Sequence, residues 1–78
     1  MIGKALKYMR KNNNFKQEII AKKLNIKCNT LSQYETENRQ ASFEIIEKIA
    51  NMCGYKIYFE NDNLNDRFTI NDLKRKDV

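Results

Sequence analysis

Apolar residues recur at helical spacing in the first half of the chain and predict three helices. These helices span residues 2–12, 16–24 and 28–36, and the asparagines at 12–14 separate the first from the second. Their buried stripes consist of Ile2, Ala5, Leu6 and Met9, then Ile20, Ala21 and Leu24, then Leu31 and Tyr34. Phe15 precedes the second stripe as a candidate hydrophobic staple. The second and third helices are therefore joined by a very short connection.

That connection and a fourth helix follow from turn and cap residues. Asn25 stands where a left-handed residue is needed, and Ile26 is an apolar plug. Residues 37–41 form a polar loop, and Ser42 is a favourable N-cap for a helix that Gly54 ends. The core stripe of this helix consists of Phe43, Ile46, Ile49, Ala50 and Cys53.

After residue 54 the pattern changes from helical to alternating. Residues 55–60 predict a strand, and residues 67–70 repeat the alternation, so the two runs form a hairpin around the polar residues 61–66. The apolar side of this hairpin carries Tyr55, Ile57, Phe59, Phe68 and Ile70. Residues 72–78 are either a short helix or a loose tail. Because a two-stranded ribbon is marginal in water, it needs something to pack on or pair with.

The composition narrows the class of protein. A chain of 78 residues with 41% hydrophobic residues forms one domain with one small core, which dimerisation would help to stabilise. There is no histidine, so Cys28 and Cys53 cannot form a four-ligand zinc site, and we expect free thiols. We expect no metal and no cofactor. The sequence has no export signal and no membrane-spanning run, so the expected location is the cytoplasm.

The positive charge is concentrated in the first half of the chain. Residues 1–41 contain nine Lys and Arg residues against three Asp and Glu, whereas residues 42–78 contain six against seven. A concentrated basic surface attracts polyanions, and nucleic acid is the commonest such partner of a cytoplasmic protein. The alternative is an ordinary solvated helix face.

The outer face of the third helix carries short hydrogen-bonding groups in place of charges. These are Cys28, Asn29, Thr30, Ser32 and Gln33. A helix in the DNA major groove needs such groups to match base edges, and the amides of Asn29 and Gln33, one turn apart, can each make a two-point contact with adenine. Thr30 and Ser32 can bond bases or phosphates, and Cys28 can touch a thymine methyl group. Alternatively, Asn29 only caps the helix and Gln33 is only solvated.

Residues 5–54 resemble the Cro/C1-type (XRE-like) helix-turn-helix family of DNA-binding domains. The matching features are Arg10, the pattern Gln17-Glu18-x-x-Ala21, Ile26, Leu31, the pair Tyr34-Glu35 and the helix from Ser42 to Cys53. The resemblance implies a mostly α fold, in which residues 1–54 form a compact four-helix lambda-repressor-like helix-turn-helix domain. A C-terminal β-strand or β-hairpin and a tail over residues 55–78 follow it.

The resemblance also implies a role for each residue of the site. The residues expected to contact bases are Cys28, Asn29, Ser32 and Gln33. The residues expected to contact phosphates are Lys16, Gln17, Lys23, Lys27, Thr30, Asn38 and Arg39. Gln17 also braces the third helix, and a partly buried salt bridge between Arg10 and Glu35 ties the first helix to it.

The chain departs from the family pattern at four positions. Asn25 stands where glycine is typical, and Lys16 replaces the usual Ser or Thr cap. Glu37 replaces a frequent glycine and Ala41 a frequent proline. The shape of the loop at 36–41, and the phosphate contacts expected from it, depend on these changes.

The C-terminal extension is the expected dimerisation element. Strand 55–60 either pairs with its mate across a two-fold axis or forms the hairpin whose apolar face meets the partner. The expected contacts are Tyr55, Ile57, Phe59, Phe68 and Ile70. In the alternative, the ribbon folds back on the first and fourth helices of its own chain.

Three classes of function compete at this point. The first is a sequence-specific regulator of transcription that binds double-stranded DNA, a dimeric repressor. The second is an antitoxin of a toxin–antitoxin pair, because strands after such a domain resemble those proteins, which repress their own operon and bind a toxin. An enzyme has little support, since the chain lacks histidine and shows no phosphate loop or nucleophile-base pair. A role on a membrane surface is equally weak.

Overall fold

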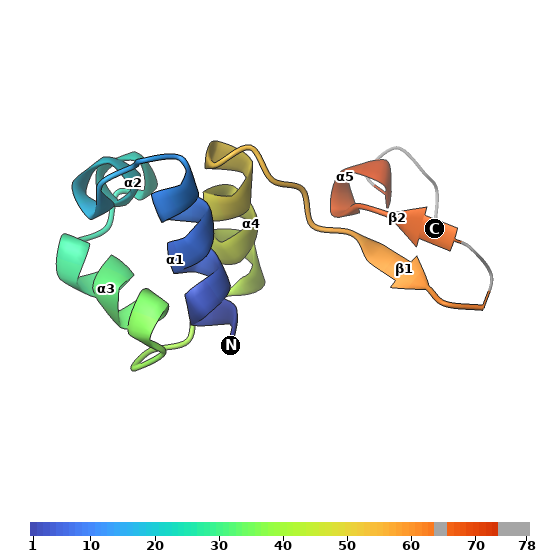
Figure 1. The fold of residues 1–78 in the computed structure, drawn as a ribbon, viewed down its shortest axis with the longest axis horizontal. Coiled ribbons are helices and arrows are strands. Elements are labelled where there is room, and N and C mark those ends of the chain that lie inside the picture. The colour runs from blue at the N-terminus through green and yellow to red at the C-terminus, as the bar shows by residue number, and fades with distance from the viewer. Residues whose placement is uncertain (64–65, 74–78) are drawn as a thin grey trace.

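Four helices form the body of the molecule, and a small hairpin with a fifth helix projects from one end of it (Figure 1). The structure, a computed structural model, describes residues 1–63 and 66–73. In chain order the elements are α1 (Ile2–Asn12), α2 (Gln17–Leu24), α3 (Cys28–Thr36), α4 (Phe43–Met52), β1 (Phe59–Asn61), β2 (Asp66–Phe68) and α5 (Ile70–Leu73). The predicted fold class, mostly helical with a C-terminal hairpin, is confirmed.

The helix ends follow from local chemistry. The Ser42 hydroxyl accepts a hydrogen bond from the backbone N–H of Ile45 at 3.2 Å, as expected of an N-cap. Asn25 adopts the left-handed conformation with φ 58°, which confirms its expected place in the turn. Helix α2 begins one residue later than predicted, because Lys16 has extended backbone angles and is the N-cap.

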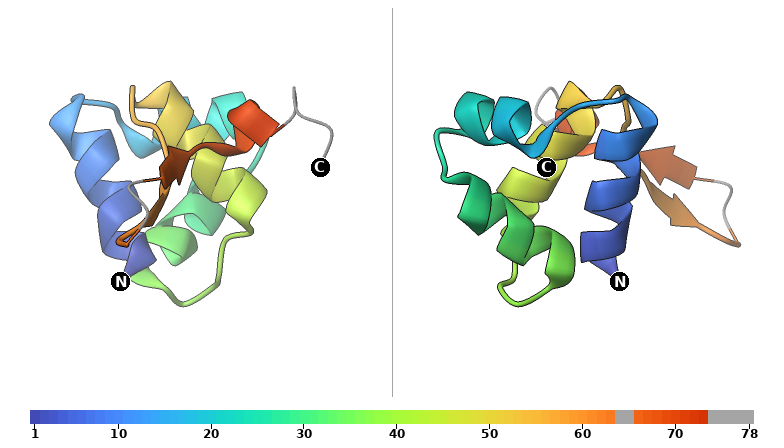
Figure 2. Two further views of the ribbon diagram at one scale, coloured as in Figure 1. Left: turned by 90° about the vertical axis from the view of Figure 1, so that its right-hand side faces the viewer. Right: turned by 60° about the vertical axis from the view of Figure 1, so that its left-hand side comes forward.

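The core lies where the four helices meet. Each helix contributes one of the largest fully buried side chains, which are Leu6, Ile20, Leu31 and Ile49. Figure 2 shows these helices from two further directions. Helix α3 packs mainly against α1 and α2, so its position depends on these two helices.

Two residues of the predicted stripes lie at the surface instead. Ile2, in the first turn of α1, is 48% exposed, and Phe43, the first residue of α4, is 42% exposed. The Phe43 ring faces the hairpin, where its centroid lies 6.2 Å from that of Phe59. The helical spacing of apolar residues extends to the ends of α1 and α4, whereas the core covers only their middle parts. For this reason the pattern wrongly predicted that Ile2 and Phe43 are buried.

The predicted hairpin forms, but its first strand begins later than expected. Gly54 has φ 83°, and its N–H bonds to the Asn51 carbonyl while that of Tyr55 bonds to the Ala50 carbonyl. This pair of bonds is a Schellman motif, which closes the end of α4. Tyr55 and Ile57 therefore precede the strand. The Tyr55 hydroxyl also accepts a hydrogen bond from Asn12 at 3.0 Å, so this residue is held on its own helical body.

The second strand ends earlier than predicted for a similar reason. The N–H of Thr69 donates to the Asp72 carboxylate at 2.9 Å, and the N–H of Asp72 donates to the Thr69 hydroxyl at 3.3 Å. This reciprocal capping box starts α5. Ile70, which we expected in the strand, is thus the first residue of a helix. Of the predicted C-terminal helix or tail, residues 74–78 lie outside the described residues.

The hairpin has one aromatic and one polar face. The strands pair antiparallel, with Phe59 opposite Phe68 and Glu60 opposite Arg67. The Phe59 and Phe68 rings stack with centroids 5.4 Å apart, and on the other face the Arg67 guanidinium lies 4.7 Å from the centroid of Tyr58. The hairpin projects from the body (Figure 1). At its base it contacts α4, where the Phe59 ring lies near that of Phe43 and residues 56–58 line a cavity together with Glu47 and Asn51. None of the described helices is long and apolar enough to cross a membrane.

Gly3 lies where α1 comes closest to the end of α3. A Cβ atom at this position would lie 2.7 Å from the backbone oxygens of Tyr34 and Glu35, which is closer than real Cβ atoms approach. Because these oxygens belong to the backbone, a larger residue would force the two helices apart.

We expect Gly3→Ala to lower the free energy of unfolding by about 1–3 kcal/mol through overpacking. Helix propensity alone predicts the opposite sign, a gain of up to about 1 kcal/mol. Urea denaturation of this variant would measure the difference, with Lys4→Ala on the exposed side of the same turn as the control. A more stable Gly3→Ala protein would show that the helices do not pack this closely.

Candidate nucleic-acid interface

The residues expected to contact bases lie along the open side of α3. This helix buries Leu31 and Glu35, and the amides of Asn29 and Gln33 lie on the opposite side at helical spacing. Asn29 is exposed and Gln33 is half-buried. Neither side chain makes a hydrogen bond within the described part of the chain. The alternative in which Asn29 caps the helix is wrong, because the N-cap is Lys27.

The other expected base contacts flank this amide ridge, which we define as Asn29 and Gln33. Cys28 is an exposed free thiol and Ser32 is half-buried. Sequence reasoning missed Thr36, which is exposed and lies seven residues after Asn29 on the same side of the helix. Its hydroxyl donates to the Ser32 carbonyl at 3.0 Å, so its methyl group is the part that remains for contact with a ligand.

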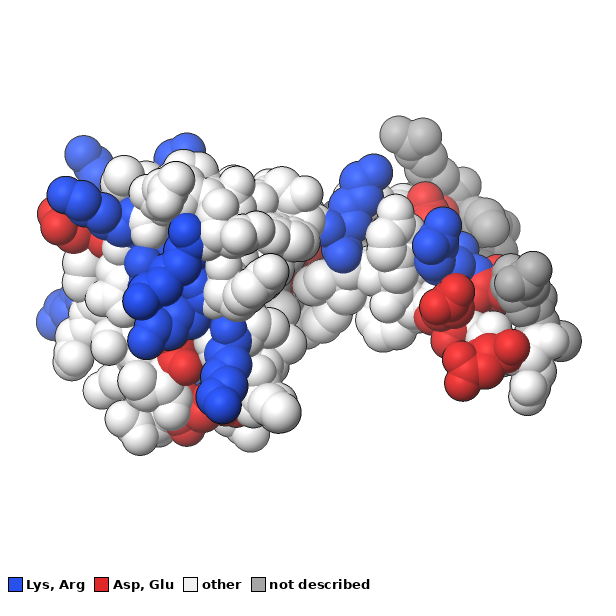
Figure 3. Space-filling model, in the orientation of Figure 1, with Lys and Arg blue, Asp and Glu red and all other residues white. Residues whose placement is uncertain are grey.

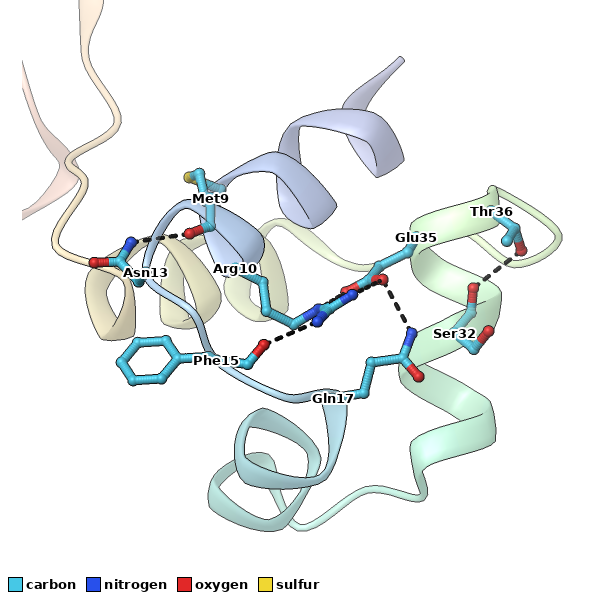
Figure 4. Close-up of polar contacts among 8 residues, drawn as sticks. All are labelled: Met9, Arg10, Asn13, Phe15, Gln17, Ser32, Glu35 and Thr36. Carbon is cyan, nitrogen blue, oxygen red and sulfur yellow. Dashed lines mark hydrogen bonds and ion pairs between the residues drawn. The ribbon is translucent and has the colours of Figure 1, made fainter.

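A buried ion pair fixes the rotation of α3. The Arg10 Nε donates to Glu35 Oε2 at 2.6 Å, and its Nη2 donates to Glu35 Oε1 at 3.0 Å (Figure 4). The remaining Arg10 nitrogen donates to the Phe15 carbonyl at 2.9 Å. The Gln17 amide donates to Glu35 Oε1 at 3.0 Å. We call these four residues the Arg10–Glu35 network, which joins α1, α2 and the loop between them to α3.

The network keeps Glu35 ionised. Burial by itself raises the pKa of the Glu35 carboxyl, but the hydrogen bonds from Arg10 and Gln17, together with nearby positive charges, outweigh it and hold the pKa below its usual value. The positive charges of Arg10 and Lys7 act in the same direction. The same pairing raises the pKa of Arg10. Sequence reasoning missed Lys7, because its proximity to Glu35 arises only from the packing of α1 against α3.

Three of the expected phosphate contacts lie together beside the ridge. A shallow groove along α3 is lined by Asn25, Ile26, Lys27, Thr30, Tyr34 and Arg39. The family resemblance implies phosphate contacts for Lys27 and Arg39, and the hydroxyl of Thr30 suits the same role. Tyr34 had been assigned only to the core, yet its half-buried ring also lines this groove. Because Tyr34 follows Thr30 by four residues, the sequence already places both on the same side of α3.

The first turns of α2 and α3 leave backbone donors open. Their N-caps are Lys16 and Lys27, and neither makes a side-chain capping bond, in contrast to Ser42 of α4. The first N–H groups of such a helix have no intrahelical partner, and the helix dipole makes this end attractive to anions. Within the described part of the chain, the amide of Gln17, the first residue of α2, donates one hydrogen bond, to Glu35. Its second amide hydrogen remains for another acceptor.

The other expected phosphate contacts are more scattered. Lys23 and Asn38 are exposed, and neither lines the groove beside α3. In the loop after α3, Glu37 adopts the left-handed backbone that glycine usually supplies, with φ 64°. The Arg39 N–H then bonds to the Gln33 carbonyl at 3.2 Å. The loop therefore turns back on α3 despite the departure from the family pattern.

Charge is unevenly distributed over the molecule. Figure 3 shows Lys and Arg side chains over α1 and α2 of the helical body and Asp and Glu side chains at the tip of the hairpin. Most of the basic residues therefore lie on the same body as the amide ridge, although Lys56 and Arg67 belong to the hairpin end. Among residues 1–63 and 66–73, no group of three or more His, Cys, Asp or Glu side chains could hold a metal ion.

Comparison with known proteins gives one family match. A family model described as Helix-turn-helix matches residues 6–59, about two thirds of the chain. The matched span runs from α1 through α4 to the first residue of β1. No curated protein and no solved structure gives a significant match.

We expect Arg10→Met to lower the free energy of unfolding by about 3–5 kcal/mol at pH 7, because it leaves the Glu35 charge buried and unpaired. In the native protein the folded pKa of Glu35 lies below its unfolded value of about 4.3. The stability that Glu35 contributes is therefore complete above that pH and is lost as the pH falls through the folded pKa. In the variant, burial still raises this pKa but the hydrogen bonds and charge of Arg10 no longer lower it, so the stability deficit should shrink as the pH falls.

Urea denaturation from pH 7.5 to pH 4 would measure both effects. The double variant Arg10→Met/Glu35→Leu is the control, because it removes the unpaired charge, and it should recover most of the lost stability. An Arg10→Met protein as stable as the wild type at pH 7 would contradict the structural role of the pair.

Proposed function

The chain belongs to the Cro/C1-type helix-turn-helix family of DNA-binding regulators of transcription, and on this basis we propose that it is a repressor that contacts bases with α3. The observation that carries the proposal is the amide ridge. Asn29 and Gln33 lie on the open side of a helix whose opposite side is fixed by Leu31 and the Arg10–Glu35 network. A helix face that contacts only water usually carries charged residues, which keep the protein soluble, so uncharged amides at these positions indicate a binding role.

Recognition of bases follows from the chemistry of the ridge. Each carboxamide carries a donor and an acceptor, the pair of groups that matches the N7 and N6 positions of adenine in the major groove. The two residues lie one helical turn apart, so they face neighbouring base pairs. Cys28, Ser32 and Thr36 flank them with small groups that allow the helix to approach closely. We therefore propose adenine-containing steps at the centre of each half-site.

Two flanks of α3 supply the contacts to the DNA backbone. On one side lie Lys16, the open N-terminus of α2 and the second amide hydrogen of Gln17. On the other side lies the groove that contains Lys27, Thr30 and Arg39. Contacts with phosphates on both sides would fix the depth and register of α3 in the groove without selecting a sequence.

A repressor of this type acts as a dimer. One α3 recognises only a few base pairs, so a two-fold dimer that binds two half-sites is needed for useful specificity. A dimer bound across a promoter would exclude the polymerase. The proposed operator is accordingly a palindrome with one half-site for each chain.

We expect Asn29→Ala and Gln33→Ala to relax base preference at separate positions of each half-site, by roughly 1–3 kcal/mol for each lost two-point contact. Selection of bound sites from a random duplex library, carried out with the wild type and both variants, would measure this. Neither side chain supports the fold, so circular dichroism and melting should be unchanged. Identical selected sites for all three proteins would refute the assignment of these residues to bases.

We expect Lys16→Ser to shift stability and DNA affinity in opposite directions. A serine N-cap should raise the free energy of unfolding by about 1 kcal/mol. Loss of one phosphate contact should weaken binding to all sequences alike and reduce the salt dependence, the slope of log K against log salt, by about 0.9.

The matched control is Lys22→Ser, which removes the same charge from the last turn of α2, where a cation is favourable. It should bring no gain in stability and leave the salt slope nearly unchanged. Equal slopes for wild type and Lys16→Ser would remove Lys16 from the phosphate contacts.

A further inference from the structure

The segment that leads into the hairpin has open backbone groups. Among the residues that the structure describes, Lys56, Ile57 and Tyr58 make no backbone hydrogen bond, and they are followed directly by β1. The described sheet has two strands, so β1 pairs with β2 on one side and has a free edge on the other. Among the helices and strands labelled in Figure 1, none lies beyond that edge of β1. Free strand edges are ready to pair with another chain.

The side chains of residues 56–60 match those of a second copy of the segment that runs antiparallel to the first. In order they are a cation, an apolar residue, a tyrosine, an apolar residue and an anion, namely Lys56, Ile57, Tyr58, Phe59 and Glu60. We propose that this segment pairs antiparallel with the same segment of a second copy, across a two-fold axis at Tyr58. Lys56 then lies opposite Glu60 of the mate, and Ile57 opposite Phe59. This inference deepens the dimer of the proposed function by giving its interface and register.

Other symmetric registers are less favourable. An axis at Phe59 would place Ile57 opposite Asn61 and Lys56 opposite Asp62. An axis at Glu60 would place two carboxylates directly opposite each other, which is destabilising. An axis at Ile57 would require Tyr55 to pair with Phe59, but Tyr55 is already bonded to Asn12 and to the end of α4. The axis at Tyr58 pairs Lys56 with Glu60 and also places Ile57 opposite Phe59. The axis at Phe59 also pairs opposite charges, but it leaves Ile57 opposite a polar residue.

The same register unites the faces of the two hairpins. Side chains alternate along a strand, so Ile57 and Phe59 share the face of Phe68, while Tyr58 and Glu60 share that of Arg67. Phe59 is 41% exposed and its neighbour Phe43 is 42% exposed. Pairing would extend the aromatic face from one chain to the next and reduce this exposure. A two-stranded ribbon would become a four-stranded sheet, which is far more stable.

The pairing leaves the amide ridge open. The hairpin and α3 lie at opposite ends of the molecule (Figure 1). The dimer can therefore form without DNA. Dimer formation is therefore measured without DNA. A failure of the proposed pairing would leave the proposed base recognition unaffected, and the reverse also holds.

A charge exchange tests the pairing of Lys56 with Glu60. Each of the variants Lys56→Glu and Glu60→Lys creates two pairs of like charges at the interface, and each should weaken the dimer roughly tenfold. The double variant restores two opposite pairs and should recover the wild-type dissociation constant. Analytical ultracentrifugation over a range of concentrations would measure it, with Asp62→Lys as a control outside the paired segment.

Three results would overturn the inference. They are a wild-type chain that is monomeric at all concentrations, single variants that dimerise like the wild type, and a double variant that is no better than the singles. A monomer would leave the free edge to a strand of a different protein.

A cross-link tests the position of the axis. In a Cys28→Ser background, Tyr58→Cys places two thiols directly opposite each other, within the distance that a disulfide requires. Mild oxidation should then give a covalent dimer. Ile57→Cys is the matched control, because each thiol introduced there would lie opposite Phe59 of the mate and out of reach of the other thiol. Efficient cross-linking of the Ile57→Cys protein and none of the Tyr58→Cys protein would overturn the register.

Discussion

The orientation of α3 depends on one buried ion pair. Glu35 lies on the same side of the helix as Leu31, and Arg10 holds it there with two hydrogen bonds. A helix whose inward side is fixed by both a packed leucine and a paired carboxylate has only one rotation available, and in that rotation Asn29 and Gln33 face outward. Packing alone would define this rotation less sharply, because the buried stripe of α3 is narrow. A charged pair of this kind adds little net stability, so its use here is to specify the orientation.

The first turns of α2 and α3 lack the stabilising side-chain cap that α4 has. Helix α4 starts with a serine that caps it, whereas α2 and α3 start with lysines that make no side-chain cap. A lysine at this end is unfavourable for the helix dipole and favourable for an anionic ligand. Glu37 likewise holds a left-handed backbone that costs about 1 kcal/mol relative to glycine. Such local conflicts concentrate at functional sites in natural proteins.

The sequence predicts the helices well because one periodicity explains each of them, and the turn at Asn25 follows from the conformational preference of one residue. The strand boundaries were wrong where hydrogen bonds override alternation. Tyr55 closes α4 through its N–H, and the Thr69–Asp72 capping box turns Ile70 into a helix. The spacing of Thr69 and Asp72 is that of a capping box, so the start of α5 could have been predicted from the sequence. The place of Lys7 beside Glu35 and the groove beside α3 were not readable, because they arise from contacts between helices that no local pattern encodes.

The helical body and the hairpin carry different surface features. The body carries the ridge and most of the positive charge, while the hairpin carries acidic residues at its tip and the free strand edge. Because DNA repels acidic groups, the proposed complex would place the hairpin away from the duplex, where its edge could contact another protein. If the two bodies are joined only through their hairpins, the separation of the two α3 helices is set by the body and by residues 55–58. The spacing of half-sites that the dimer accepts then depends on the stiffness of that short connection, which Tyr55 anchors to α1 and α4.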